Sequence, residues 1–289
     1  MRSFIAKKLS FTRKRKIKSF INKIKKKYVD TFLSYSPVDL QKKLQDLGIK
    51  QGDAIMVHSG WSFLNGFQGT VQDAIKVFKE TVGPEGTLLM VSMPYRNAAY
   101  EYLEQLKCFN VSRTSGRMGM MSEIFRRQKD VLRSLHPAHP VLVWGKDASW
   151  FVRRHANCLF SCGEGSPFEK LAKHNGKVIF FDVEFNTMTF FHYIEHVVRE
   201  KLPFPLYGEK EYDLKVLDYE GQEIHVKAHA FSKDAVAGRR PMLLEKEVLK
   251  RQCFAWDKIG NTSIGVMNVT DALECGKDMV CRGDFFHKM

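Results

Sequence analysis

The sequence predicts an α/β fold in which parallel strands are connected by helices. Residues 53–58 form an apolar run typical of a buried strand, and residues 70–82 repeat apolar side chains at helical spacing. A second apolar run at residues 87–93 follows a Gly-Pro-Glu-Gly turn. Because strand, helix and strand succeed one another within about forty residues, we expect a parallel pair joined by a right-handed crossover.

The composition sets the broad class of protein. The chain has 289 residues, of which 44% are hydrophobic and 27% charged, enough for a substantial core in one large domain or two small ones. Its six cysteines include no C-x-x-C pair, so we expect reduced thiols in the cytoplasm. The absence of a run of 18 or more apolar residues argues against a transmembrane helix. The absence of a small-residue cleavage site after an apolar segment argues against a signal peptide.

Positive charge is concentrated at the N-terminus. The net charge of the chain is +14, and residues 1–29 hold twelve Lys or Arg and no Asp or Glu. The remaining 34 basic residues stand against 32 acidic ones, so the rest of the chain is only slightly basic. We therefore expect two parts, a basic arm at residues 1–30 and a globular body at residues 31–289.

Apolar residues of the arm recur at helical spacing among the basic ones. They are Ile17, Phe20, Ile21, Ile24 and Tyr28. A basic amphipathic helix of this kind suits an anionic membrane surface. Two other interpretations stay open. The arm is a tail that is disordered or packs on a partner, or it contacts nucleic acid, although the aromatic motifs of RNA-binding sheets are missing.

The body begins with a short amphipathic helix at residues 38–47, which a glycine ends. The strand at residues 53–58 leads into a polar, glycine-bearing loop at residues 59–69. This loop lies at the carboxyl end of the strand, where open α/β sheets bind ligands. Residues 94–116 are irregular and polar-aromatic, as in a loop over a site.

The same patterns of apolar residues, caps and turns predict the remaining elements. They are helices at residues 119–127 and 149–157, a strand at residues 141–144, a helix that opens with Ser166 as N-cap, a strand at residues 177–183, an antiparallel hairpin of residues 212–217 and 223–228, and helices at residues 242–251 and 268–275.

Residues 187–196 read Thr-Met-Thr-Phe-Phe-His-Tyr-Ile-Glu-His and are typical of the first turns of a helix, with Thr187 or Thr189 as N-cap. His192 and Glu195 are three residues apart, so both side chains project from one side of the helix. A carboxylate beside an imidazole fixes its tautomer and stabilises the imidazolium, which suits a general base near neutral pH.

The same pair has two other interpretations. A His and a Glu three residues apart also occur by chance on solvated helix faces. In addition, His192-Tyr-Ile-Glu195-His196 fits the H-x-x-E-H pattern of inverted zinc peptidases, in which both histidines bind zinc and the glutamate activates a water. That interpretation needs a third ligand, which the sequence does not identify.

Four segments occur in an order that resembles one family. They are residues 52–59 with the loop to Gly69, residues 83–90, residues 133–137 (Arg-Ser-Leu-His-Pro) and the T-x-x-H-x-x-E pattern from Thr189 to Glu195, with weaker echoes at residues 114–116, 165–167 and 258–260. This ordered set, spread over roughly residues 36–270, resembles the aminoglycoside 3-N-acetyltransferases and their amino-sugar-acylating relatives.

The resemblance implies a three-layer α/β/α fold with a central mixed, largely parallel sheet, which makes residues 31–289 an acyltransferase domain. It implies direct transfer of an acyl group from acetyl-CoA, or another acyl-CoA, to the amino group of an amino sugar, without a metal. His192 is then the base that removes the acceptor's proton, and Glu195 orients it.

The resemblance also assigns binding residues. For the coenzyme they are His58, Ser59, Gly60, Trp61, Ser115, Arg133 and Ser134, and for the acceptor they are His136 and Thr189. Small residues let a pantetheine arm follow the backbone, and Arg133 can meet a phosphate. Two of the histidines have a second interpretation, His136 as a partner of the turn ahead of Pro137 and His58 as a buried structural residue.

Charge bears on the identity of the acceptor. Because aminoglycosides are polycations, a cleft that selects them should be acidic, whereas this body is slightly basic. Phe190 and Asp182 also depart from the family pattern and can reshape the acceptor pocket. We therefore expect an amino sugar on a nucleotide or lipid carrier, used in surface-glycan assembly by a cytoplasmic enzyme peripheral to the inner membrane face. The alternatives are an aminoglycoside antibiotic as acceptor, and a catalytically silent, membrane-tethered binding protein.

Overall fold

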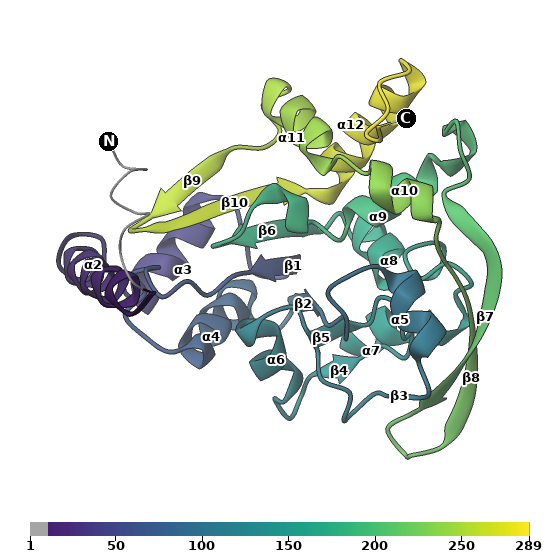
Figure 1. The fold of residues 1–289 in the computed structure, drawn as a ribbon, viewed down its shortest axis with the longest axis horizontal. Helices are drawn as coiled ribbons and strands as arrows, with labels where there is room; N and C mark the ends of the chain where they lie inside the picture. The colour runs from purple at the N-terminus through teal and green to yellow at the C-terminus, as the bar shows by residue number, and fades with distance from the viewer. Residues whose placement is uncertain (1–10, 289) are drawn as a thin grey trace.

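The computed structural model describes residues 11–288, and a seven-stranded mixed sheet forms its centre (Figure 1). The strand order is β4-β5-β2-β1-β6-β10-β9, in which β1 pairs in parallel with β2 and β6 while the outer pairs are antiparallel. The strands are β1 Ala54–Ser59, β2 Thr87–Val91, β4 Leu132–Arg133, β5 Val141–Gly145, β6 Lys177–Phe181, β9 Trp256–Ile259 and β10 Thr262–Asn268. The predicted central mixed sheet is confirmed, but it is not largely parallel, because only the pairs of β1 with β2 and β6 are parallel.

Helices cover both faces of this sheet (Figure 1). One hydrophobic cluster joins the sheet to α3, α4 and α6, and a second joins it to α7, α8, α9, α11 and α12. Neighbouring residues of β1 divide between the two clusters, Ile55 and Val57 in the first and Met56 in the second, as the period of two in a strand requires. The arrangement is therefore the predicted three-layer α/β/α fold.

The helices have the following bounds. They are α2 Phe11–Phe32, α3 Pro37–Asp46, α4 Val71–Val82, α5 Ala99–Gln105, α6 Met120–Arg126, α7 Ala148–Val152, α8 Pro167–Lys173, α9 Phe191–Val197, α10 Lys233–Gly238, α11 Pro241–Lys250 and α12 Val269–Cys281, with 3-10 turns at His155–Asn157, Phe185–Thr187 and Arg199–Lys201. Within residues 11–288, no helix is long and apolar enough to cross a membrane.

A second sheet of three strands packs beside the main body. It consists of β3 Phe109–Asn110, β7 Tyr207–Leu217 and β8 Glu223–Phe231, with β7 and β8 forming the predicted hairpin. Tyr212, Leu214 and Val226 bury their side chains in a third cluster on this sheet. Both hairpin strands are longer than the sequence pattern predicts. The added part of β7 includes three exposed charged residues, 209–211, which give no apolar signal, whereas the added residues of β8, 229–231, are half-buried or buried and pair with the start of β7.

Local chemistry explains where the predicted helices begin. Ser36 caps α3 and Thr70 caps α4, each through a capping box with an aspartate three residues later. Gly83 follows α4 with a φ of 68°, which only glycine adopts at low cost.

The prediction differs from the structure in several elements. Residues 94–116 contain α5 and β3 in addition to irregular segments, and the helix predicted at residues 149–157 is interrupted at Arg154, whose φ is 66°. The strands β4, β9 and β10 and the helix α10 were not predicted. β4 and β9 are edge strands of two and four residues, which are too short to show a periodicity, and each pairs with the next strand along the chain, whereas β10 is a seven-residue strand between β6 and β9.

Candidate active site

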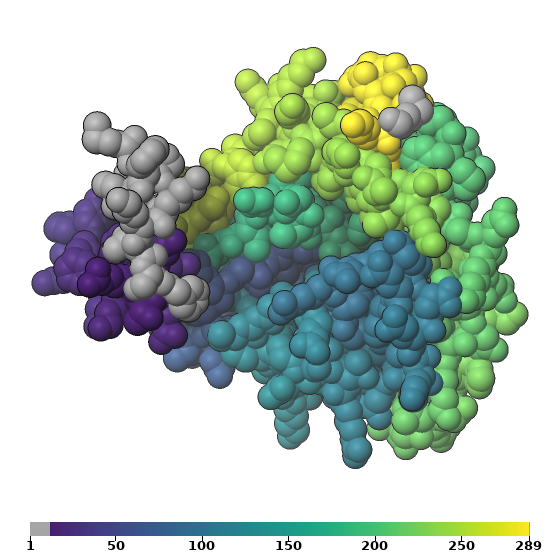
Figure 2. Space-filling model, in the orientation of Figure 1, coloured from purple at the N-terminus to yellow at the C-terminus, as the bar shows by residue number. Residues whose placement is uncertain are grey.

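A cavity of about 480 Å³ opens at the carboxyl ends of the central parallel strands. Its lining includes His58 and Ser59 at the end of β1, Val91 at the end of β2 and Val183 just after β6. Open α/β sheets bind ligands at this edge, and the volume suits a small-molecule site. Figure 2 looks toward the hollow between the blue segment that contains α5 and the yellow-green segment that contains α10.

His192 and Glu195 lie on α9, and their side chains bond to each other. Glu195 Oε2 accepts a hydrogen bond from His192 Nδ1 at 2.8 Å, with the carboxylate fully buried and the imidazole 18% exposed. The ring lines the cavity, and its Nε2 has no hydrogen-bond partner within residues 11–288. A proton on Nδ1 leaves the Nε2 lone pair free, which is the tautomer that a general base needs.

The start of α9 differs from the prediction. The helix begins after Phe190, which makes no side-chain cap, so neither predicted threonine is the N-cap. Thr187 instead ends a 3-10 turn and donates to the carbonyl of Glu184 at 2.8 Å. The Thr189 carbonyl accepts from the amide of His192 at 3.0 Å, so Thr189 belongs to the turn that leads into the His-Glu pair.

Two residues outside the motif hold the second oxygen of Glu195. Oε1 accepts hydrogen bonds from Arg239 Nε at 2.8 Å and from His287 Nε2 at 2.7 Å. Backbone hydrogen bonds between residues 238–240 and 286–288 bring both side chains to the carboxylate. The sequence analysis gave neither residue a role, because 44 and 92 positions separate them from Glu195 and no local pattern marks them.

These contacts set the charges of the pair. Burial raises the pKa of Glu195, but the charge of Arg239 and the hydrogen bonds from His192 and His287 outweigh burial and hold this pKa well below its usual range. Burial, reinforced by the charge of Arg239, lowers the pKa of His192 below 6.5, against the opposing effect of Glu195. At neutral pH the carboxylate is ionised and the imidazole is neutral, so the imidazole can accept a proton.

Two further histidines border the pair. His58 is buried, its Nε2 has no partner, and burial lowers its pKa to about 3. His139 packs edge-on against His192 with ring centroids 5.5 Å apart, and its ring nitrogens contact the hydroxyls of Ser161 at 2.7 Å and Tyr95 at 3.2 Å. Burial also holds the pKa of His139 well below 6.5. Both rings are neutral, so Glu195 supplies the charge that stabilises an imidazolium at His192.

Three of the nine predicted binding residues line this cavity, namely His58, Ser59 and Thr189. Gly60 lies outside the lining, at a position where an added side chain would come within 2.2 Å of the Asp182 carbonyl. Trp61 packs against Phe67 with ring centroids 5.8 Å apart, and Ser115 is exposed. The coenzyme contacts proposed for these last residues stay predictions.

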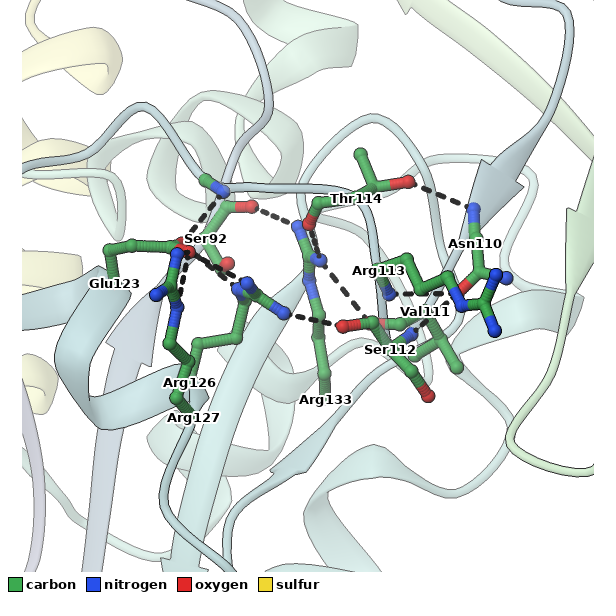
Figure 3. Close-up of polar contacts among 11 residues, drawn as sticks. Ser92, Asn110, Val111, Ser112, Arg113, Thr114, Glu123, Arg126, Arg127 and Arg133 are labelled. Carbon is green, nitrogen blue, oxygen red and sulfur yellow. Dashed lines mark hydrogen bonds and ion pairs between the residues drawn. The ribbon is translucent and has the colours of Figure 1, made fainter.

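Arg133 is buried away from the cavity, where it holds a loop in place. Figure 3 shows its terminal nitrogens directed at the carbonyls of Ser92, Val111 and Thr114. The residue is 2% exposed, and its guanidinium lies 4.7 Å from the ring centroid of Phe109. Both terminal nitrogens donate to backbone carbonyls and the residue lies outside the cavity lining, so the contact between this guanidinium and a coenzyme phosphate stays a prediction.

Ser134 and His136 also make structural contacts. Ser134 Oγ contacts His155 Nδ1 at 2.7 Å. His136 Nδ1 accepts from the amide of Ala138 at 3.2 Å, and its Nε2 bonds to the carbonyl of Cys158 at 3.1 Å. Both residues are fully buried outside the cavity lining. The structure therefore favours the turn role of His136 and supports neither predicted binding role.

The side-chain positions do not support the zinc interpretation. His196 contacts the Tyr207 hydroxyl at 2.8 Å and the Glu164 carboxylate at 2.7 Å, whereas His192 and Glu195 bond to each other. In the part of the chain that the structure describes, no group of three His, Cys, Asp or Glu side chains is placed to hold a metal ion.

Sequence comparison places this chain beside known acetyltransferases. Residues 56–280 match the family model described as aminoglycoside 3-N-acetyltransferase. The SPbeta prophage-derived aminoglycoside N(3')-acetyltransferase-like protein YokD of Bacillus subtilis (strain 168) is 28% identical over 173 residues, which cover 54% of this chain and 63% of that protein. Aminoglycoside N(3)-acetyltransferase III of Serratia marcescens is 27% identical over 192 residues, which cover 62% of this chain and 69% of that protein. The matched part thus spans about two thirds of the length of these curated relatives.

Solved acetyltransferase structures match a larger share of this chain than the sequence relatives do. The solved structure of AAC-IIIb in a binary complex with CoASH matches with a TM-score of 0.72 at 25% identity, covering 86% of this chain and 97% of that one. Sisomicin-bound AAC-VIa matches with a TM-score of 0.72 at 22% identity, covering 86% and 99% of the two chains, and shares the fold.

Proposed function

The chain belongs to the aminoglycoside 3-N-acetyltransferase family, and on that premise we propose that it transfers an acetyl group from acetyl-CoA to an amino group of an amino sugar. The observation that carries this proposal is the orientation of His192. Its Nδ1 is fixed by buried Glu195, and its Nε2 is free in a cavity at the carboxyl ends of the parallel strands.

The reaction follows from that arrangement. An amine with an ordinary pKa near ~10 is protonated at neutral pH and is not a nucleophile until it sheds a proton. The ammonium first releases one proton to water. His192 Nε2 then accepts a second proton from the acceptor nitrogen as that nitrogen bonds to the thioester carbonyl carbon. The imidazolium, stabilised by Glu195, then returns the proton to the sulfur as the carbon–sulfur bond breaks. Direct transfer of this kind needs no nucleophile from the protein.

The residues present fit a thioester and an amine as substrates. The cavity has a volume of about 480 Å³, and the buried Nε2 of His58 beside it lacks a partner. Apolar side chains of Met93, Phe191 and Phe231 make up part of the lining. Such a lining excludes water from the reacting carbonyl and limits hydrolysis of the thioester.

The names and ligands of the relatives support aminoglycosides as the acceptor class. The Serratia relative is named an aminoglycoside N(3)-acetyltransferase, and AAC-VIa binds sisomicin. We therefore take an aminoglycoside as the first candidate acceptor.

The charge of the cavity favours a second candidate. Its lining includes Arg96, Arg117 and Arg239, of which Arg239 is balanced by Glu195, and, from residues 11–288, no Asp or Glu. Asp182 and Glu184, which are close in sequence to lining residues, line a separate pocket. A polycation would be repelled by such a cavity, whereas an amino sugar on a nucleotide or lipid diphosphate would meet complementary charge.

The cellular role depends on which acceptor is used, and a carrier-linked sugar would imply one such role. If the acceptor is a carrier-linked sugar, the reaction belongs to surface-glycan assembly, and the enzyme acts in the cytoplasm at the inner face of a membrane. This location and the division into an arm of residues 1–30 and an acyltransferase domain of residues 31–289 remain parts of the proposal.

Coenzyme A release from acetyl-CoA tests the proposal with the wild-type protein and His192→Ala. The panel contains aminoglycosides, free amino sugars and nucleotide-linked amino sugars. We expect one acceptor class to accelerate release, and His192→Ala to reduce kcat by about 10²–10⁴-fold, the range for a lost general base, with acetyl-CoA binding retained.

A matched control is His225→Ala, because His225 is an exposed histidine on β8 that pairs with Asp213. It should leave the rate unchanged. Acceleration by aminoglycosides alone selects the first acceptor class, and acceleration by nucleotide-linked sugars alone selects the second. If no amine accelerates release and acetyl-CoA does not bind, the enzymatic proposal fails and the binding-protein alternative replaces it.

A further inference from the structure

Helix α2 turns its apolar side chains away from the body. Ile17, Phe20, Ile21, Ile24 and Tyr28 lie on one side of the helix at intervals of three or four residues, and they are between 45% and 65% exposed. We call these five residues the α2 stripe. None of them belongs to any of the three hydrophobic clusters.

The opposite side of α2 contacts the body. Val29 is 4% exposed and approaches Gly66, while Asn22 and Lys26 are half-buried. The ammonium of Lys26 lies 5.7 Å from the ring centroid of Phe63. At roughly 100° per residue, this side lies nearly opposite the α2 stripe.

This orientation is the reverse of the usual one. An amphipathic helix of a globular protein buries its apolar stripe against the core and exposes its polar side. Here the polar side rests on the body and the stripe is exposed, so burial within residues 11–288 does not account for the apolar pattern. The stripe therefore suits an apolar surface outside the chain.

The basic residues indicate which surface that is. The helix carries nine Lys or Arg and a single Asp. On the helix, Lys14, Lys18 and Lys25 flank one edge of the α2 stripe, and Lys16 and Lys27 flank the other. Apolar side chains bordered on both edges by lysines match an anionic lipid surface, which accepts the stripe among the acyl chains and the ammonium groups among the headgroups.

We propose that the α2 stripe is the membrane-docking face of this protein and that its ligand is an anionic lipid bilayer. The helix lies in the plane of the interface at one end of the molecule, beside α3 and β9 (Figure 1). The proposal specifies the membrane part of the proposed function, and acetyl transfer to soluble acceptors can be measured separately from it.

The same observations argue against two other binding partners for the α2 stripe. A second copy of the chain would bring two strongly basic helices together along their stripes, where like charges repel. A nucleic acid would use the basic residues but would leave the exposed apolar side chains without a partner.

Co-sedimentation of the full chain with vesicles tests the proposal. We expect binding to phosphatidylcholine vesicles that contain phosphatidylglycerol, weak binding to pure phosphatidylcholine vesicles, and loss of binding at high salt. The double variant Ile21→Gln, Ile24→Gln keeps every charge and a good helix former at both positions, and it should lower the partition coefficient at least about tenfold.

The matched control is Val38→Gln, Leu249→Gln, which removes two exposed aliphatic side chains from α3 and α11. It should bind vesicles as the wild type does. Both double variants should keep the wild-type rate of coenzyme A release on a soluble acceptor, which separates a failure of docking from a failure of the enzymatic proposal.

Three outcomes would overturn the proposal. The first is equal binding of the wild type to neutral and anionic vesicles, or no binding to either. The second is unchanged vesicle binding of the stripe variant. The third is a dimer of the wild type, seen by sedimentation equilibrium, that the stripe variant dissociates, since this would make the stripe an interface between copies.

Discussion

At the scale of residues, Glu195 holds three side chains of the candidate site through hydrogen bonds. One oxygen fixes His192, and the other receives Arg239 and His287. An ionised carboxylate with no solvent exposure is costly unless its lone pairs are satisfied, and these three donors satisfy them. The carboxylate is held rigidly in this way, so the imidazole that it orients is rigid as well.

His287 is therefore predicted to be a positioning residue for the reaction. We expect His287→Ala to lower kcat about tenfold, since one charge-assisted hydrogen bond to Glu195 is lost. Burial and the charge of Arg239 are the main causes that lower the pKa of His192, and an electrostatic effect of His287 is the smallest one, so removal of His287 should raise that pKa slightly and move the acid limb of the kcat profile to slightly higher pH. Measurement of kcat and KM against pH checks both expectations.

Two control variants separate a positioning role of His287 from a general loss of activity. His287→Gln can still donate to Glu195 and should recover part of the rate, whereas the exposed His225→Ala should change neither rate nor profile. A His287→Ala enzyme whose stability falls while its kcat and acid limb stay at wild-type values would show that the residue is only structural.

At the scale of elements, the loop between β3 and α6 is held by two charged groups, buried Arg133 and half-buried Glu123 (Figure 3). Arg133 bonds to carbonyls at its start, and Glu123 accepts the amide of Gly116 at 3.0 Å. Hydrogen bonds from Arg126, together with that amide, lower the pKa of Glu123 to about 2. The loop leads to Arg117, which lines the cavity, so these contacts fix one wall of the site.

Arg133→Met should destabilise the fold without a specific effect on the coenzyme. The change leaves the carbonyls of Ser92, Val111 and Thr114 without their buried donor, and we expect a loss of about 3 kcal/mol in the free energy of unfolding. Urea denaturation measures this loss. Arg127→Met is the matched control, because the side chain of Arg127 is 69% exposed, and it should change stability by less than about 0.5 kcal/mol.

Kinetics with acetyl-CoA test whether the role of Arg133 is structural. If Arg133→Met keeps wild-type stability and raises the KM for acetyl-CoA instead, the guanidinium contacts the coenzyme in solution and its buried position does not describe the working enzyme.

At the scale of the whole molecule, the chain separates a basic helix from a nearly neutral catalytic body. The helix α2 contributes to none of the three hydrophobic clusters and touches the body mainly through Val29. The cavity lies between the layers of the body, where β1, β2 and β6 end. The proposed lipid binding and the proposed acetyl transfer would therefore use different surfaces.

A chain shortened by its first 26 residues should fold and remain active. Because none of residues 12–26 is buried, we expect the free energy of unfolding to change by no more than about 1 kcal/mol. The rate of coenzyme A release on a soluble acceptor should be unchanged, while binding to anionic vesicles is lost. A shortened chain that fails to fold, or that folds without activity, would contradict the division into an arm and an independent body.

The sequence by itself determined the central α/β unit and the His192–Glu195 pair. Both depend on short-range physics, namely the apolar periodicity of β1, α4 and β2, the capping boxes at Ser36 and Thr70, and the spacing of three residues on a helix. The resemblance of ordered motifs added the family, which the match over residues 56–280 confirms.

Only the tertiary structure decided which residues support that pair. Arg239 and His287 reach Glu195 through backbone pairing of residues 238–240 with 286–288, and Arg133 is enclosed by a loop that precedes it. The side of α2 that meets the body is likewise set by packing around Val29 and Gly66. Burial and contact between residues distant in the chain are properties of the folded core, so no local pattern could have indicated them.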